Sequence, residues 1–202
     1  MAEIIPTRGA ALALAEEKRF IETGYEFLDE KRMLLAATLL EELDLWRAAR
    51  AAYDEELARA IAALRAAIAR HGFAPLELYP SAEGAAEGFS FPTRNFLGLG
   101  LLEPAEVRWQ VPGPVETLDA SEAAEACRAA FAALVPHAVL VAVRAANIRR
   151  LIREYRATER RARALENVIL PETVANLASI TDYLDQNDQE EAIRIRNAGR
   201  NA

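Results

Sequence analysis

The feature that most constrains this chain is an apolar pattern that continues without a proline from Thr7 to about Arg70. Sixteen positions between Leu14 and Ile68, taken in steps of three or four, hold thirteen apolar residues. The mean step is about 3.6 residues, which is the period of one face of a nearly straight α-helix. Such a helix would be roughly 95 Å long. A stripe of this length predicts a second long helix as its partner.

The C-terminal part of the chain is expected to supply that partner. It is rich in helix formers, and Asp119 or Ser121 is a candidate N-cap. Pro136 and Pro171 lie inside it, and because the pattern resumes after each of them, they predict kinks and not breaks. Its apolar stripe recurs at steps of three and four and is formed by Ala162, Leu165, Ile169, Leu177, Ile180 and Leu184.

The middle of the chain has a different composition. Six of the nine prolines and six of the nine glycines fall between residues 72 and 114, which excludes long helices there. Three stretches have strand-like composition, LELY (76–79), GFSF (88–91) and EVRWQV (106–111). One or two short hairpins in a small, partly irregular cap are therefore expected.

These segments together predict an all-α dominated fold, a long antiparallel two-helix coiled coil with a small β-hairpin cap between the helices. The expected parts are an N-terminal helix at 7–71, a Pro/Gly-rich cap at 72–118 and a C-terminal helix at 119–197, kinked near Pro136 and Pro171. The helices should form one elongated domain.

The charge distribution favours the antiparallel pairing. Residues 144–163 hold eight arginines and two glutamates, whereas residues 41–60 hold six acids and three arginines. If the helix tips lie level, these segments face each other, and opposite charges would help to fix the register. Alternatively, the arginine-rich run binds RNA or an acidic partner. Nucleic acid is disfavoured, because the formal net charge is -7 and Tyr155 is the only aromatic residue in the run.

Residue patterns typical of catalysis are missing from the sequence. There is no phosphate-binding Gly-Lys-Ser/Thr motif, and His71 and His137 stand alone without metal-ligand spacing. The single cysteine, Cys127, has no histidine at a useful helical spacing. We therefore expect no catalytic residue, no cofactor site and no metal site. The chain has neither a signal peptide nor an uninterrupted apolar run of 18 residues, so we expect a cytoplasmic protein without direct membrane insertion.

Three segments resemble the D subunit of the V/A-type rotary ATPases. Residues 6–35 are similar to its opening Pro-Thr-Lys/Arg and the later Gly-x-x-Leu-Leu-Lys-x-Lys-Arg block, with matches that include Pro6, Thr7 and Gly24. Residues 158–196 are similar to its Thr-x-Arg-Arg-Val-Asn-Ala-Leu-Glu motif and the following proline, although Ala162 and Arg163 replace Val-Asn. NFLGLGL (95–101) resembles its Asn-x-x-Gly-Val hairpin.

This resemblance implies a central-stalk, or rotor-shaft, subunit that couples ATP synthesis or hydrolysis to ion translocation and is itself non-catalytic. The implied partners are the catalytic A and non-catalytic B subunits of the ATPase head, the F subunit, and a socket subunit on the membrane rotor. The complex would be peripheral to the membrane. Arg8, Arg194 and Arg196, which lie near the helix tips, are the expected partner contacts. The alternative is a free-standing helical-hairpin adaptor or chaperone.

Overall fold

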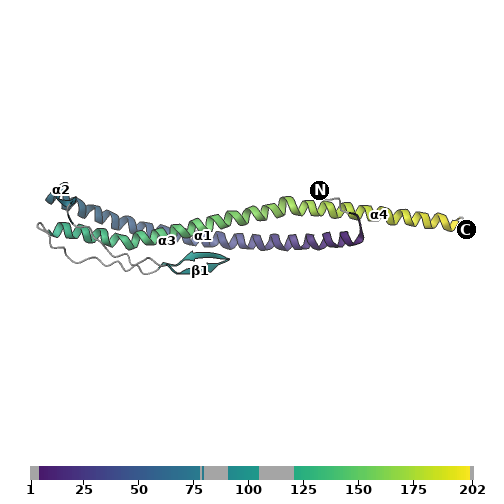
Figure 1. The fold of residues 1–202 in the computed structure, drawn as a ribbon, viewed down its shortest axis with the longest axis horizontal. Helices are drawn as coiled ribbons and strands as arrows, with labels where there is room; N and C mark the ends of the chain where they lie inside the picture. Colours follow the sequence, from purple (N-terminus) through teal and green to yellow (C-terminus); the bar gives the residue numbers. More distant parts are fainter. Residues whose placement is uncertain (1–4, 78, 80–90, 105–120, 201–202) are drawn as a thin grey trace. The chain divides into compact units, whose positions relative to one another are not determined.

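The computed structural model describes residues 5–77, 79, 91–104 and 121–200, with side chains through residue 197. Long helices dominate it, and a two-stranded antiparallel hairpin lies between them in the sequence, so the predicted fold class is confirmed (Figure 1). The elements in chain order are α1 (Arg8–His71), α2 (Phe73–Glu77), β1 (Thr93–Phe96), β2 (Leu99–Leu102), α3 (Glu122–Ala164), η1 (Leu165–Ile169) and α4 (Leu170–Arg200).

The first helix begins where the sequence predicts. Thr7 caps α1, because its Oγ1 accepts a hydrogen bond from the Ala10 amide at 3.1 Å, and its carbonyl accepts one from Ala11. His71 is the last residue of α1, and Gly72 follows it with a φ of 78°, the left-handed conformation that commonly ends a helix. The described residues divide into two compact units, Met1–Leu34 with Tyr155–Ala202, and Leu35–Glu154.

In the first unit, the beginning of α1 packs antiparallel to the end of α3 and to α4. Arg8 forms an ion pair with Asp188 at 2.9 Å. Further along α1, a Cβ atom added to Gly24 would lie 3.7 Å from Leu165 Cδ1. The helices are therefore close at Gly24, and the core of this unit is formed by Leu14, Ile21, Ala162, Thr173 and Ile180.

A π-helical turn, η1, interrupts the α-helical geometry just before Pro171. The Leu170 amide bonds to the carbonyl of Leu165, five residues back. A single π-turn accommodates one extra residue while the helices on either side keep their faces. The prediction that Ile169 belongs to the buried stripe is consequently wrong, because Ile169 is 40% exposed and Leu170 is half-buried.

Neither proline ends the C-terminal helix. Pro136 lies inside α3, and helix continues through Pro171 in α4. The kinks expected near the two prolines stay predictions. The local loosening expected at Pro171 takes the form of the π-turn.

In the second unit, the rest of α1 runs antiparallel to the first part of α3. Arg144 bonds to Glu42 at 2.9 Å near one end of this pairing, and His71 contacts Ser121 at the other. The level-tip register is wrong, because it would place Arg144 opposite residue 60, and the observed partner is 18 residues away (60 − 42 = 18). The tips are not level, since Arg8 near the start of α1 pairs with Asp188 while α4 continues to Arg200.

Several acids in this part of α1 pair along their own helix and not with α3. Arg144–Glu42 is the cross-helix pair that the structure shows between the two segments, whereas the acids Asp44, Asp54 and Glu56 pair with arginines three or four residues away on α1 itself. Side chains at these spacings are neighbours on one helix, so they pair without any contribution from the other helix.

The hairpin is held by α3, where Asn147 accepts a hydrogen bond from the Leu102 amide and Arg150 donates one to the Gly100 carbonyl. Its two strands pair with Phe96 opposite Leu99 and Thr93 opposite Leu102. Leu97 and Gly98 form the turn with φ values of 52° and 85°, as in a two-residue type I′ turn. The hairpin suggested by the NFLGLGL resemblance is confirmed. Of the strand-like stretches, LELY was wrong at residues 76–77, which belong to α2, while residues 88–90 and all of EVRWQV lie outside the described residues.

Candidate functional site

The three predicted contact residues all lie in the first unit, on the surface. Arg8 is 77% exposed, although it pairs with Asp188. Arg194 is 81% exposed and reaches Glu190 at 3.4 Å, and Arg196 is also exposed. Asp188 precedes Arg194 by six residues, about 9 Å along the helix axis, so the Arg8 pair and the two later arginines occupy successive turns of α4.

The end of α4 is solvent-exposed on every side. All residues from 185 to 197 are exposed. They lie on both sides of Asp188, the residue of α4 that pairs with Arg8 near the start of α1. Ile193 and Ile195 are 60% and 67% exposed, respectively. An isolated helix with exposed isoleucines has a surface suited to contact with another protein. We call residues 185–197 the α4 extension.

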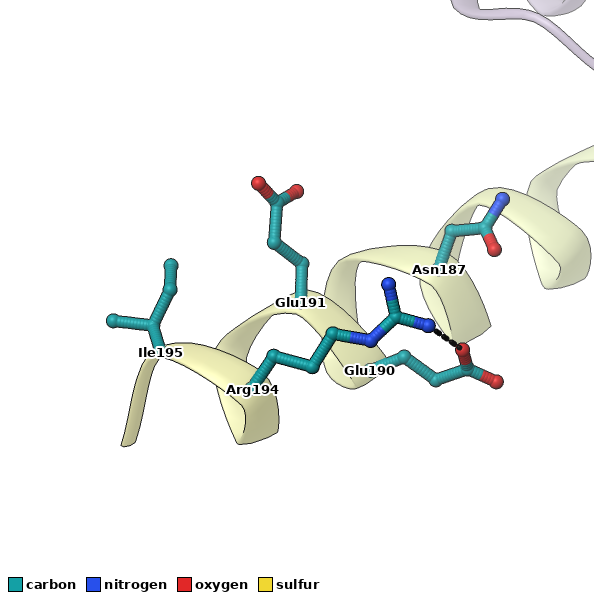
Figure 2. Close-up of a pocket in the computed structure, with 5 residues that line it drawn as sticks. All are labelled: Asn187, Glu190, Glu191, Arg194 and Ile195. Atoms are coloured by element: carbon teal, nitrogen blue, oxygen red, sulfur yellow. Dashed lines mark hydrogen bonds and ion pairs between the residues drawn. The ribbon is translucent and has the colours of Figure 1, made fainter. Parts of the chain in front are cut away.

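A shallow depression lies on one side of the α4 extension (Figure 2). In Figure 2, Glu191 and Ile195 project away from the helix, while the Arg194 side chain folds back along the axis toward Glu190. A single helix supplies all of the lining, which consists of Asn187, Glu190, Glu191, Arg194 and Ile195. Such an open site can present charge and apolar surface to a partner, but it cannot enclose a small molecule and exclude water.

Two side chains that the sequence analysis considered for chemistry are His71, which contacts a helix-capping serine, and Cys127, which is buried. His71 Nε2 contacts Ser121 Oγ at 2.5 Å, and the same hydroxyl accepts a hydrogen bond from the Ala124 amide, which caps α3. Cys127 is buried, and desolvation raises the pKa of its thiol, which lowers its reactivity. Among the described residues, no three His, Cys, Asp or Glu side chains are grouped so as to hold a metal ion.

The sequence also matches known proteins along nearly its whole length. The model of a family described as the D subunit of ATP synthase matches residues 10–200. The chain belongs to this family. The resemblance inferred from three short segments is thereby confirmed.

Individual relatives support the same assignment. The chain is 24% identical over 193 residues to the V-type ATP synthase D subunit of Thermotoga neapolitana, covering 96% of this chain and 95% of the relative. It is 29% identical over 207 residues to the V-type D subunit of Anaeromyxobacter dehalogenans, with 97% and 95% covered. The A-type ATP synthase D subunit of Haloarcula marismortui is 25% identical over 203 residues, with 96% and 86% covered.

Sequence reasoning missed a second exposed feature of this family member, on the first unit's part of α1. Phe20 and Phe27 are 80% and 65% exposed, and Leu34 is 45% exposed. The three residues are seven apart, so they lie on one side of the helix, beside the predicted core stripe. That heptad spacing of large apolar residues outside the core stripe was the signal that could have found them.

One helix, Glu122–Asn197, contains an 18-residue window with a mean hydropathy of 1.8, which is long and apolar enough to cross a membrane by length and composition. This is weak support for insertion, because core helices of soluble proteins meet the same criterion.

Proposed function

We propose that this chain is the central-stalk subunit of a V/A-type rotary ATPase or ATP synthase, in which it couples ATP synthesis or hydrolysis to ion translocation across the membrane. The family match over residues 10–200 carries the proposal, because it places the chain among ATP synthase subunits. The names of the relatives support the V/A type.

The geometry within each unit suits a part that transmits torque. The start of α1 is tied to α4 by Arg8 and Asp188, and the later part of α1 is tied to α3 by the buried Glu42–Arg144 pair. Two helices that are joined side by side resist bending and twisting more than one helix does. The chain would act mechanically, while ATP chemistry would take place in the head subunits. It is therefore proposed to be non-catalytic.

The proposed partners follow from the same assignment. The α4 extension and Arg8 would contact the catalytic A and non-catalytic B subunits of the head, and the hairpin end would contact the F subunit and the socket subunit of the membrane rotor. The complex would be bound peripherally on the cytoplasmic side of the membrane. Exposed isoleucines and arginines on the α4 extension support a protein contact at that end.

The test is to purify the tagged full-length chain from its native host, identify the associated proteins by mass spectrometry and assay the preparation for ATPase activity. The proposal predicts recovery with nucleotide-binding subunits and ion-sensitive ATP turnover. Recovery with unrelated client proteins and no ATPase activity would refute it and would support the adaptor or chaperone alternative.

The contact residues are tested by replacing Arg8, Arg194 and Arg196 together by alanine in the assembled complex. A matched control replaces three exposed arginines of the second unit, Arg47, Arg59 and Arg65, and removes the same charge. If each lost contact is worth at most about 1 kcal/mol, as for exposed ion pairs, the tip variant should lose roughly threefold to a hundredfold in affinity for the head. Coupled ATPase activity equal to that of the control would contradict the assignment of these three residues.

A further inference from the structure

Three exposed arginines form a row along one face of α3 in the first unit. Arg156, Arg160 and Arg163 are separated by four and three residues, and all are exposed. With 3.6 residues per turn, their side chains fall within a sector of about 60° around the helix axis. We call these three residues the arginine row. The same three- and four-residue spacing continues back along the sequence of α3 to Arg153 and Arg149, both also exposed.

The arginine row points away from the packed side of its helix. Thr158 and Ala162, which are 0% and 1% exposed, mark that packed side. Each lies two residues after a member of the row, and therefore about 200° around the axis from it. The row is thus on the opposite face, where contact with the paired helix of this unit cannot neutralise it.

Pairing within the chain leaves most of the row's charge unmatched. Arg163 donates to Glu159 at 2.6 Å, on the same helix. In the part of the chain that the structure describes, Arg156 and Arg160 form no ion pair. Like charges four residues apart destabilise a helix slightly, and an ordinary solvated face mixes both signs. The row therefore has a cost that neither helix pairing nor solubility explains.

We infer that the arginine row is a docking surface for a carboxylate-rich segment of another protein chain. Guanidinium groups bind carboxylates in a bidentate manner, and arginine is the preferred cation at protein interfaces. A line of three such groups over two helical turns matches an acidic helix or extended segment lying along α3. This contact is separate from the one proposed for the α4 extension.

The aromatic side chains near the arginine row favour a protein occupant over nucleic acid. Single-stranded nucleic acid is typically held by aromatic stacking, whereas Tyr155, the neighbouring aromatic residue, is half-buried and about 100° from Arg156 around the helix.

The occupant can be identified by photo-cross-linking in the native host. A benzoylphenylalanine placed at Arg153, which is exposed and continues the row's spacing, leaves all three arginines of the row in place. After irradiation of the full-length tagged chain in its native complex, we expect a cross-linked peptide rich in Asp and Glu from a different protein. Cross-links only to nucleic acid, to lipid, to a second copy of this chain or to peptides without acidic residues would overturn the inference, as would the absence of any cross-link.

The charge requirement is tested with two triple variants of equal net charge. R156Q/R160Q/R163Q removes the row, and R47Q/R59Q/R65Q removes three exposed arginines of the second unit. Glutamine keeps the helix propensity high, and far-UV circular dichroism checks that both variants fold. The row variant should bind the cross-linked partner about 3-fold to 100-fold more weakly, as expected for three exposed ion pairs, and the control should stay within about twofold of the unaltered protein. Equal binding by the two variants would refute the inference.

The lysine variant R156K/R160K/R163K adds a readout for bidentate recognition. It keeps the charge but lacks the planar fork of arginine, so we expect binding intermediate between the unaltered protein and the glutamine variant. Failure of this contact is distinguishable from failure of the proposed function. ATPase subunits that still co-purify without an acidic cross-link would refute the docking surface alone, whereas an acidic cross-link without ATPase subunits would refute the function alone.

Discussion

Replacing Asn147 by leucine should release the hairpin from α3. Asn147 is 0% exposed, and its amide group makes two hydrogen bonds of 2.8 Å to Leu102. Asn147 Oδ1 accepts from the Leu102 amide, and Asn147 Nδ2 donates to the Leu102 carbonyl, so the side chain pairs with the outer edge of β2 as another strand would. Leucine has a similar size but can replace neither bond.

The size of the effect follows from the two backbone groups that would lose their partners. An unsatisfied buried donor or acceptor costs about 1–3 kcal/mol, which gives about 2–6 kcal/mol for the pair. Because Leu102 is only half-buried, water can solvate these groups in part, and we expect the lower part of the range, about 2–4 kcal/mol.

The assay is hydrogen exchange of the Leu102 amide, together with urea denaturation of the full chain. A loss of about 2–4 kcal/mol predicts roughly 30-fold to 1000-fold faster exchange at Leu102 in N147L. The control is N95A on the same hairpin, where the lost bond from the Gly98 amide is exposed and should be worth less than about 1 kcal/mol. Unchanged Leu102 exchange in N147L would refute this account of how the hairpin is held.

Three further perturbations test other parts of the structure. Glu42→Ala should destabilise the second unit by about 3–5 kcal/mol in urea denaturation, because it leaves Arg144 largely buried without a carboxylate, whereas the double variant E42M/R144L should stay within about 1 kcal/mol of the unaltered protein. Burial raises the pKa of the Cys127 thiol, so the unfolded chain loses this proton at a lower pH than the folded chain does. The free energy of unfolding should therefore fall as the pH rises above the ordinary thiol range. The C127A variant should show a shallower fall between pH 8 and pH 10. Deleting Ile169 should turn the π-turn into α-helix and keep the faces of the flanking helices, so its thermal denaturation midpoint should exceed that of a deletion of Ala175, which rotates the rest of α4 by about 100°.

The long helices could be predicted from the sequence because their signals are local and repeated. Thr7 and His71 mark the ends of α1, and the apolar period between them predicts a helix without reference to any other part of the chain. The hairpin at residues 93–102 was found through its resemblance to a family motif and not through strand propensity. Propensity instead favoured LELY, where Leu76 lies in a short helix.

The register and the π-turn could not be predicted, because both depend on contacts between distant residues. The predicted register assumed that the helix tips lie level, whereas α4 continues past Asp188, the partner of Arg8. Likewise, the stripe containing Ile169 assumed an uninterrupted period, and one extra residue before Pro171 makes Leu170, which is half-buried, the less exposed of the two.

The candidate contact surfaces were only partly accessible to sequence reasoning. Exposure near the tips was expected for Arg8, and the structure places it on the surface. The direction of Arg156 and Arg160 was left open, since the arginine-rich run was expected either to face an acidic helix or to bind an acidic partner. The direction of a side chain on a helix depends on where its neighbours pack, which here is marked by Thr158.

The most direct test of the proposed rotor function is single-molecule observation of the assembled head. A probe is attached through a cysteine at the exposed hairpin residue Arg94, in a C127A background that leaves no other thiol in this chain, and the head subunits are fixed to a surface. The account predicts that the probe rotates in one direction when ATP is added and stops when ATP is removed. ATP turnover by the assembled head with a stationary probe would contradict it.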